Sequence, residues 1–263
     1  MRNGDIMAHI ATELDFRRII KHNPGNVLDR NYIHRVYKSG YMIVSDINLL
    51  SFCYPVEYFD GILIRCFSST IEETIDMVSF ITPMLKGRIF LSHITDDFIE
   101  PFRHIGFKNH YKVSGFYKMD YNLSLKSYPC EIIDFSMEYL MQLEYMDRSL
   151  FSNTWRLSFD DISTLSRDRN IKIRLCLSKE SLIGFSILRL NRGFGYGYII
   201  KIAVDGALHR RGIGTVILND AIQIFKSSSI LPIFTDTISE GSAEFFKSNG
   251  FREYSKSCLL VKE

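Results

Sequence analysis

A weak internal repeat constrains the fold of this 263-residue chain more than any other feature of its sequence. Each copy has the pattern of a short amphipathic helix that ends at a glycine, with a phenylalanine leading into a strand-like run. The first copy spans residues 98–108 and the second spans residues 242–252. At one constant offset, the matching residues are Glu100, Phe102, Gly106 and Phe107 with Glu244, Phe246, Gly250 and Phe251. Two such units, each closing a half of similar length, predict two related domains.

The predicted junction between these domains is the polar stretch at 122–129, which ends in a proline. The length of the chain is sufficient for two domains of ordinary size, and it also allows one large domain. Because the repeat favours two, we expect an N-terminal domain over residues 1–125 and a C-terminal domain over residues 130–263.

Hydrophobic periodicity predicts an alternation of helices and strands in both halves. In the first half we expect helices at 11–21, 71–85 and 96–104 and strands at 41–45, 49–54, 61–67, 88–92 and 111–121. In the second half, before the closing helix, we expect helices at 137–148, 159–166 and 213–226. The strands expected there lie at 131–134, 171–177, 182–190, 196–204, 233–237 and 254–261. Meandering strands followed by strand-helix-strand indicate an α/β fold.

The charge balance excludes whole-protein attraction to polyanions. With 32 Lys and Arg against 30 Asp and Glu, the formal net charge is +2. So small a charge gives no field that would recruit nucleic acid or an anionic membrane. The first residues lack the apolar core of a signal peptide, and no apolar run is long enough to cross a bilayer. A cytoplasmic location is therefore expected.

The five cysteines lie far apart, mostly inside apolar runs. An odd number without CxxC spacing argues against a disulfide framework and against a zinc site. We expect buried, reduced thiols and no metal.

The segment most informative about chemistry joins the strand at 196–204 to the helix that begins at Ile213. Gly212 and Gly214 remove side chains where a ligand would approach the backbone, and the helix start offers unpaired amide donors and a positive dipole. Arg210 and Arg211 add charge-assisted contacts. This pattern predicts an anion cradle suited to a pyrophosphate.

Two familiar phosphate cradles do not fit this segment. A dinucleotide-binding fingerprint needs a third glycine, but Ile217 stands at that position, and no acid-terminated βαβ unit follows. A P-loop needs Gly-Lys-Ser/Thr at the helix start, and that triplet is absent from the segment.

The run from His209 to Gly214 resembles the acyl-CoA-binding motif of the GNAT superfamily, in which a strand leads to Gln/Arg-x-x-Gly-x-Gly/Ala and then a helix. It departs from that pattern at His209, where Gln or Arg is usual, and at Gly206, where proline is common. The closing segment at 242–251 is similar to the last helix of the family. The resemblance implies a GNAT-like acyl-CoA N-acyltransferase fold, a mixed sheet flanked by helices, and the repeat extends it to a tandem arrangement.

The same resemblance implies where an acyl-CoA would bind. Strands four and five of the domain splay apart, and the pantetheine arm lies in the gap. The residues expected to contact acetyl-CoA are Ile202, Ala203, Val204, His209, Arg210, Arg211, Gly212, Ile213, Gly214, Thr215 and Phe246. In the N-terminal half, the stretch at 68–73 has no glycine pair and carries two acids. We therefore predict that this half has lost CoA binding.

The catalytic groups depart from the family pattern. Many relatives carry a tyrosine in the closing helix that protonates the departing thiolate, and Phe246 stands at the matching position. Tyr254 and Tyr198 are substitutes by location, with a packed aromatic role as the alternative for each. Lys201 stands where relatives often carry a glutamate, so its charge has the wrong sign for a base.

The acceptor side is predicted between the first two helices of the C-terminal half. Phe151 and Trp155 resemble acceptor-binding positions, although a core role for Trp155 stays open. Asp147, Asp160 and Asp161 flank these helices, and exposed or capping roles are expected for them.

Together these features predict an N-acyltransferase that moves an acetyl or short acyl group from acyl-CoA to a primary amine by direct attack in a ternary complex. The expected acceptor is a small molecule, such as an amino sugar or an amine metabolite, and a homodimer is compatible with this interpretation. The alternatives are a protein N-terminal or lysine acetyltransferase, and a non-catalytic acyl-CoA-binding protein.

Overall fold

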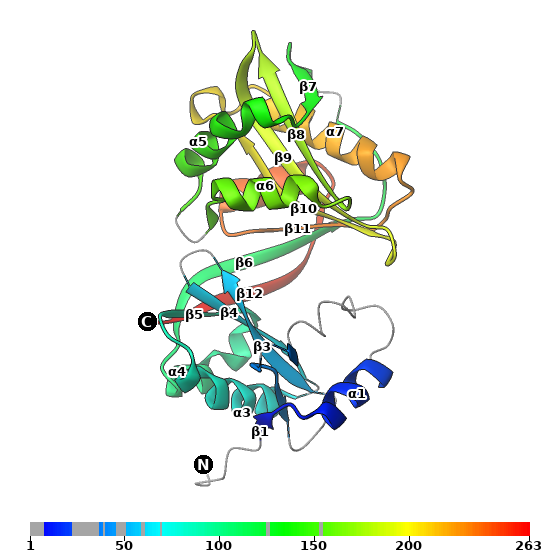
Figure 1. Cartoon of the computed structure of the whole chain (residues 1–263). Helices are drawn as coiled ribbons and strands as arrows, with labels where there is room; N and C mark the ends of the chain where they lie inside the picture. The colour runs from blue at the N-terminus through cyan, green and yellow to red at the C-terminus, as the bar shows by residue number, and fades with distance from the viewer. Residues whose placement is uncertain are drawn as a thin grey trace. The chain divides into compact units, whose positions relative to one another are not determined.

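The computed structural model describes residues 8–22, 37–38, 40–45, 51–58, 61–68, 70–124, 127–152 and 155–263 (Figure 1). It divides into two compact units. Unit 1 consists of Met1–Val113 with Lys256–Glu263, and unit 2 consists of Ser114–Ser255.

Unit 1 is a mixed sheet with helices. Its elements are β1 (Ala8–Ile10), α1 (Glu13–His22), β2 (Ile43–Ser45), β3 (Phe52–Tyr58), β4 (Gly61–Phe67), α3 (Ile71–Ile81), η1 (Thr82–Met84), β5 (Arg88–Ile94), η2 (Asp96–Phe98) and α4 (Ile99–His104). The strand order is β1-β2-β3-β4-β5, with β4 and β5 parallel and the other pairs antiparallel. Its main core joins α3 and α4 to this sheet through Met77, Val78, Ile81 and Phe102.

Unit 2 repeats this plan with longer strands. Its elements are β7 (Glu131–Asp134), η3 (Met137–Tyr139), α5 (Leu140–Leu150), α6 (Phe159–Arg167), β8 (Ile171–Ser178), β9 (Ser181–Asn191), β10 (Tyr196–Val204), η5 (Gly206–Leu208), α7 (Ile213–Ser227), β11 (Ile233–Thr237) and α8 (Glu240–Ser248). The order is β11-β10-β9-β8-β7, with β10 and β11 parallel. Helices α5 and α6 pack on one face of the sheet, and α7 packs on the other.

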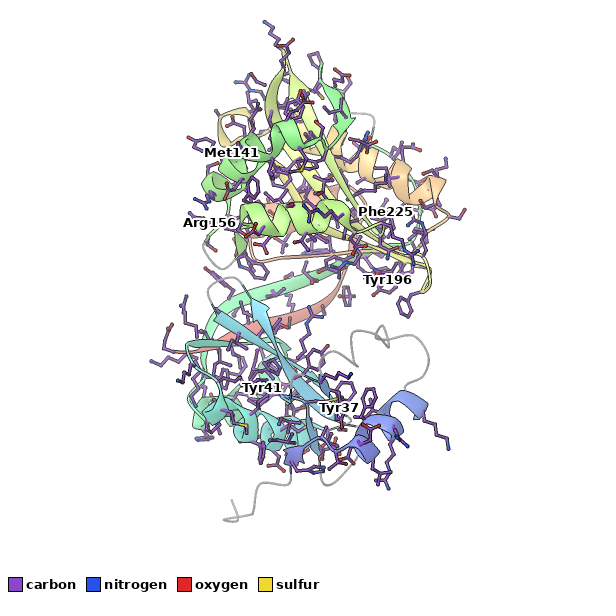
Figure 2. The ribbon with its side chains drawn as sticks, in the orientation of Figure 1. Tyr37, Tyr41, Met141, Arg156, Tyr196 and Phe225 are labelled. Atoms are coloured by element: carbon purple, nitrogen blue, oxygen red, sulfur yellow. The ribbon has the colours of Figure 1, made fainter. Side chains whose placement is uncertain are left out.

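Alternation along β10 explains how its two faces are covered. Gly197 and Ile199 face α7, and the missing side chain of Gly197 leaves room for the Phe225 ring, which is labelled in Figure 2. A β-carbon at Gly197 would lie 2.4 Å from that ring, so a larger residue there would displace it. Tyr198 and Ile200 therefore point to the opposite face, toward the side of α5 and α6.

Two long strands exchange between the halves of the sequence: β6 (Lys108–Lys118) and β12 (Arg252–Lys262). The second part of β6 pairs with β11 in an antiparallel ladder within unit 2. The second part of β12 pairs with β5 in an antiparallel ladder within unit 1. Each half of the sequence therefore contributes its last strand to the sheet built by the other half.

The exchanged strands carry a pair of equivalent lysines. Lys118 of β6 donates from Nζ to the carbonyl of Asn249, 3.2 Å away, at the C-terminal end of α8. Lys262 of β12 donates to the carbonyl of Ile105, 2.8 Å away, at the C-terminal end of α4. A cation at a helix C-terminus satisfies free carbonyls and complements the helix dipole. These lysines have the same offset as the paired glycines of the repeat, so the repeat includes the contact that holds each exchanged strand.

Within the described residues, every helix and strand expected from the sequence is present. The ends of these elements differ from the expected ones by a few residues. The short β1 was missed because three residues carry too little pattern. Residues 49 and 50 of one expected strand lie outside the described residues. The compact units differ from the expected domain boundaries, because the chain changes units inside β6 and β12 rather than at 122–129.

Candidate active site

A gap opens between the two parallel strands of unit 2. The β10–β11 ladder runs only from Gly197 opposite Ile233 to Ile199 opposite Thr235. The Thr235 hydroxyl donates to the Ile199 carbonyl at 3.1 Å and closes the paired part. β10 then continues for five residues to Val204. Its edge toward β11 is left with backbone donors and acceptors that a ligand can bind.

Strand alternation determines which residues of β10 offer backbone groups to this gap. The amide of Asp205 donates to the carbonyl of Ile183 on β9, 3.0 Å away. Because successive residues direct their backbone groups to opposite sides, Ala203 also faces β9, and Ile202 and Val204 face the gap. The Val204 carbonyl accepts a hydrogen bond from Nε2 of His209 at 2.9 Å. Three residues were expected to bind pantetheine through their backbone. The backbone groups of Ala203 point to β9 and away from the gap.

A β-bulge lies beside the start of the gap. The register of β10 against β9 shifts between Ile199 and Lys201. A bulge places two successive side chains on one face, and here Ile200 and Lys201 both lie toward α5 and α6. Without the bulge, Lys201 would share the face of Ile199, which packs under α7.

The N-terminus of α7 follows the loop after β10 and is open. Gly212 adopts a left-handed φ of 91° and makes no side-chain cap. The first helical hydrogen bond is donated by the amide of Val216 to the Gly212 carbonyl at 3.1 Å. The amides of Ile213, Gly214 and Thr215 therefore precede the helical ladder and are available as donors. By contrast, side chains of Thr70, Ser158 and Ser239 cap α3, α6 and α8.

Side chains around this helix start divide into two groups. Arg210 and Arg211 are exposed, and Arg210 also has a left-handed φ of 61°. Ile213 and Thr215 are buried, so only their main-chain amides can face a ligand. The helix start thus combines backbone donors with two exposed cations, which is the chemistry that binds a pyrophosphate.

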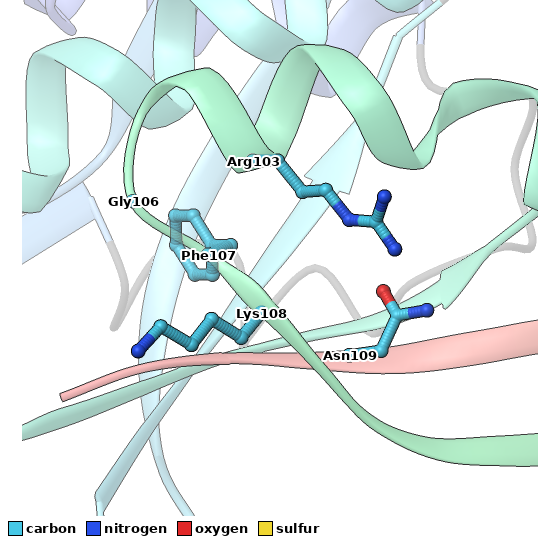
Figure 3. A pocket seen from close by; sticks show the side chains of 5 residues that line it. All are labelled: Arg103, Gly106, Phe107, Lys108 and Asn109. Carbon is cyan, nitrogen blue, oxygen red and sulfur yellow. The ribbon is translucent and has the colours of Figure 1, made fainter.

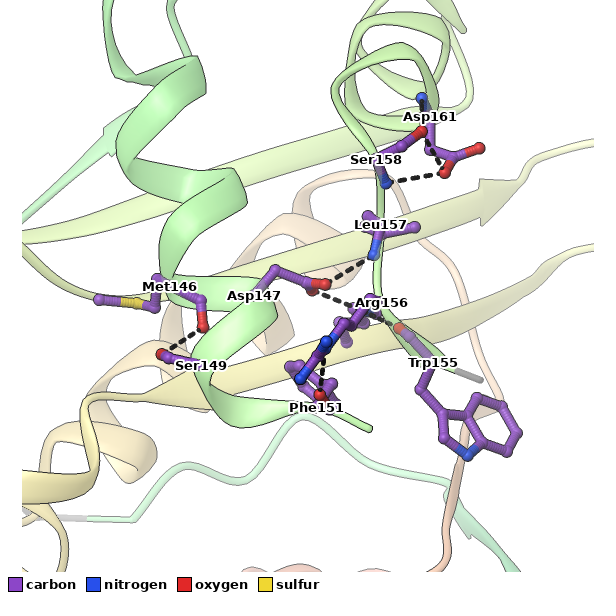
Figure 4. Close-up of polar contacts among 10 residues, drawn as sticks. Met146, Asp147, Ser149, Phe151, Trp155, Arg156, Leu157, Ser158 and Asp161 are labelled. Carbon is purple, nitrogen blue, oxygen red and sulfur yellow. Dashed lines mark hydrogen bonds and ion pairs between the residues drawn. The ribbon is translucent and has the colours of Figure 1, made fainter. Parts of the chain in front are cut away.

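Lys201 is buried in a network that ties α5 to β10. Figure 4 labels its partners Asp147, Phe151 and Trp155. The Lys201 ammonium pairs with Asp147 at 2.5 Å and donates to the carbonyl of Trp155. The centroid of the Phe151 ring lies 4.1 Å from the same nitrogen. Asp147 accepts the amide of Leu157 at 2.6 Å. Burial raises the pKa of the Asp147 carboxyl and lowers the pKa of Lys201, and each charge opposes the shift of the other.

The residues expected on the acceptor side belong to this network, and their role in acceptor binding stays a prediction. Phe151 and Trp155 contact the Lys201 ammonium, through a ring face and a backbone carbonyl, so their described contacts are internal. Asp147 is fully buried rather than exposed, because its charge is balanced by Lys201. Asp161 has the expected capping role and closes a capping box with Ser158.

The two predicted catalytic tyrosines converge on one carboxylate that the sequence analysis missed. The hydroxyl of Tyr198 donates to Asp236 of β11, and burial together with that charge raises the pKa of Tyr198 well above its ordinary value. Tyr254 of β12 is 52% exposed, and burial followed by the charge of Asp236 raises the pKa of its hydroxyl. The alternation of side chains along β11 could have pointed to Asp236. Ile233 and Thr235 are buried on one face, and Asp236 lies on the other.

The Acetyltransferase (GNAT) family matches residues 136–251, which contain the gap, the bulge and the open start of α7. This segment of the chain matches the GNAT acetyltransferase family. No curated protein sequence matches it.

Three solved structures share the fold of this chain over most of its length. A GCN5-related N-acetyltransferase from Sphaerobacter thermophilus has 10% identity and a TM-score of 0.70, covering 99% of this chain and 96% of its own. A protein from Drosophila has 10% identity and a TM-score of 0.66, covering 98% of each chain. A tandem GNAT protein from the clavulanic acid biosynthesis pathway has 8% identity and a TM-score of 0.62, covering 84% and 81%. Such low identities show the fold alone, and the predicted GNAT-like α/β fold is confirmed.

Phe246, at the GNAT position of the usual tyrosine, lies in the core. It is 2% exposed, and its ring centroid lies 6.1 Å from that of Phe116 and 5.3 Å from that of Phe251. The expected contact with a cofactor finds no support in this packing. The neighbouring Phe245 instead lies against the cradle, because a β-carbon on Gly214 would be 3.4 Å from its ring. One residue along a helix rotates the side chain by about 100°, so Phe246 points into the core and Phe245 toward Gly214.

The corresponding helix start in unit 1, that of α3, is closed by its own side chains. Thr70 accepts the amide of Glu73 at 3.3 Å. Glu73 is buried and accepts the hydroxyl of Ser51 at 2.7 Å, and Glu72 adds a second acid to the first turn. Two acids at this position oppose phosphate binding. The loss of CoA binding in unit 1 stays a prediction, and this helix start favours it.

A surface pocket of about 400 Å³ lies in unit 1 (Figure 3). It is lined by Arg103, Gly106, Phe107, Lys108 and Asn109. None of the predicted site residues lines it. Within the described part of the chain, no helix has the length and apolarity needed to cross a membrane.

Proposed function

We propose that unit 2 binds acetyl-CoA, or a short acyl-CoA, and transfers the acyl group to the primary amine of a small molecule. The observation that carries this proposal is the open N-terminus of α7 at the end of a strand whose ladder opens into a gap. The match of residues 136–251 to the GNAT family supports acetyltransferase chemistry in general.

The residues present fit a CoA ester. Amides of Ile213, Gly214 and Thr215 offer donors for the pyrophosphate, and Arg210 and Arg211 add positive charge. Backbone groups facing the gap are suited to the amides of pantetheine. Bound acetyl-CoA supplies the thioester that an amine attacks.

In this proposal a tyrosine protonates the leaving thiolate. Tyr198 is half-buried and bound to Asp236, so its hydroxyl is committed to that contact. Tyr254 is 52% exposed, and a tyrosine hydroxyl is protonated at neutral pH, so Tyr254 is the better candidate to protonate a leaving thiolate. Lys201 already contacts three partners and takes no part as a base. The acceptor amine then loses its proton to solvent.

A non-catalytic acyl-CoA-binding protein is the second candidate. The observation that favours it is the burial of Phe246, which leaves no hydroxyl at the usual position of the general acid. A protein or peptide acceptor remains the alternative within catalysis, and acetylation of a peptide panel separates it from a small-molecule acceptor.

The first test is calorimetric titration of the protein with acetyl-CoA, beside a Gly214→Glu variant. A glutamate in the first turn stabilises a helix and repels phosphate, so the variant should fold and lose binding. Gly193→Glu adds the same charge at an exposed turn of unit 2, where a β-carbon has open space, and should bind like the wild type. Equal binding by both variants would refute the cradle, and no binding to folded wild-type protein would refute the acyltransferase function.

A further inference from the structure

Aromatic rings gather on the face of the unit 2 sheet opposite α7. The ring centroid of Phe234 on β11 lies 5.8 Å from that of Tyr196 on β10 and 5.7 Å from that of Tyr254 on β12. The ring centroids of Tyr254 and Tyr117 on β6 are 6.2 Å apart. We call these four residues the aromatic face. Tyr254 is 52% exposed and the side chains of Tyr196 and Phe234 are partly exposed, so the rings are accessible in part.

The gap between β10 and β11 opens beside this face. Thr235 is the last residue of β11 paired with β10, and Asp236 is the next. Because Ile233 packs with the α7 core, Phe234 and Asp236 point to the other side of the sheet. A molecule that extends from the start of α7 through the gap therefore reaches the other side next to Asp236.

A glycine brings Tyr254 to the same carboxylate. Gly115 of β6 lies opposite Asp236 in the β6–β11 ladder. A β-carbon on Gly115 would lie 2.8 Å from the Tyr254 ring, so the ring covers the glycine. Burial and, after it, the charge of Asp236 raise the pKa of Tyr254. Asp236 thus accepts from Tyr198 and lies opposite the glycine that the Tyr254 ring covers.

Charges near Asp236 leave it able to attract a cation. Lys201 is neutralised by Asp147. Arg189 lies opposite Tyr198 on β9 and is exposed, so solvent screens its charge. A carboxylate offers about four acceptor sites, and the hydroxyl of Tyr198 uses one. Aromatic faces beside a carboxylate add cation–π attraction.

The attacking amine must be neutral, whereas a nearby carboxylate stabilises the ammonium form and so disfavours attack. Asp236 is therefore suited to a second cationic group of the acceptor, one that stays charged while another amine reacts. We propose that Asp236, with the rings of Phe234 and Tyr254, binds this second cation, and that the acceptor is a small molecule with at least two amine or guanidine groups. This inference rests on the proposed acyltransferase function.

The test compares α,ω-diaminoalkanes of three to six carbons with alkylamines of the same length, using release of free CoA from acetyl-CoA. The wild type should favour at least one diamine in kcat/KM by about tenfold or more, which is typical of a charge-assisted contact. Asp236→Asn keeps an acceptor for Tyr198 and removes the charge, so the preference should fall to near unity through a higher KM. Glu180→Gln removes one negative charge from an exposed turn and should retain the preference.

Equal rates for diamines and monoamines in the wild type, or an unchanged preference in Asp236→Asn, would overturn the proposal. If acetyl-CoA binds without turnover, calorimetric titration of 1,5-diaminopentane into the CoA complex decides: binding that Asp236→Asn abolishes supports the site, and no binding overturns it. If acetyl-CoA does not bind, the proposed function fails, and the same titration of the free protein still decides the cation site.

Discussion

Lys201→Met should strongly destabilise unit 2 because it leaves a carboxylate buried without its partner. The side chains of Lys201 and Asp147 are 6% and 0% exposed. Removing one member of a buried ion pair costs about 3–5 kcal/mol, most of it from the unpaired charge that remains. Methionine has a similar length and flexible shape, so the cavity contributes little.

A second substitution separates the cost of the charge from the cost of lost packing. Adding Asp147→Asn to Lys201→Met neutralises the buried group, and its amide oxygen can still accept the amide of Leu157. The double variant should therefore recover roughly 2 kcal/mol relative to Lys201→Met.

The dependence of stability on pH tests the same buried charge independently. Burial raises the pKa of Asp147 in the folded protein, and Lys201 opposes that shift. In Lys201→Met the folded-state pKa lies further above the unfolded value, so the variant is most stable at low pH and loses stability as pH rises through the folded pKa. Its deficit should shrink between pH 7.5 and pH 5.5.

Urea unfolding followed by tryptophan fluorescence is the appropriate measurement. Trp155 is the single tryptophan of the chain, and its carbonyl accepts from Lys201, so the signal reports on this part of unit 2. A loss below about 1 kcal/mol in Lys201→Met, or no recovery in the double variant, would show that the pair is not a buried charge pair in solution.

Three further outcomes are expected. Lys118→Met should lower the free energy of unfolding by about 1–3 kcal/mol in urea titration, because the carbonyl of Asn249 loses its charged donor at the end of α8. Deleting residues 252–263 should raise amide hydrogen exchange in β5, which would lose its antiparallel partner, and unchanged exchange would contradict the exchange of strands between halves. Cys176 should react slowly with iodoacetamide at pH 7.5 in the folded protein and fast in urea, because burial and the hydrogen bond with Cys130 raise its pKa.

Local sequence patterns were sufficient to predict the elements and the uncapped start of α7. The repeated helix-Gly-Phe unit, the helix expected at 213–226 and the strands at 196–204 and 233–237 all depend on periodicity and on glycine, which act within a few residues of the chain. The open start of α7 follows for the same reason, since Gly212 and Gly214 offer no side chain to cap it.

The partner of each strand and the orientation of single side chains depended on tertiary structure. Nothing within β6 or β12 distinguishes one sheet edge from another, so their exchange could not be read from either strand. The bulge in β10 turned Lys201 toward Asp147, and one residue of rotation along α8 buried Phe246. Asp236 joined Tyr198 and Tyr254 only because β10, β11 and β12 bring distant segments of the chain together. Such contacts are set by pairing register and packing, which no short stretch of sequence contains.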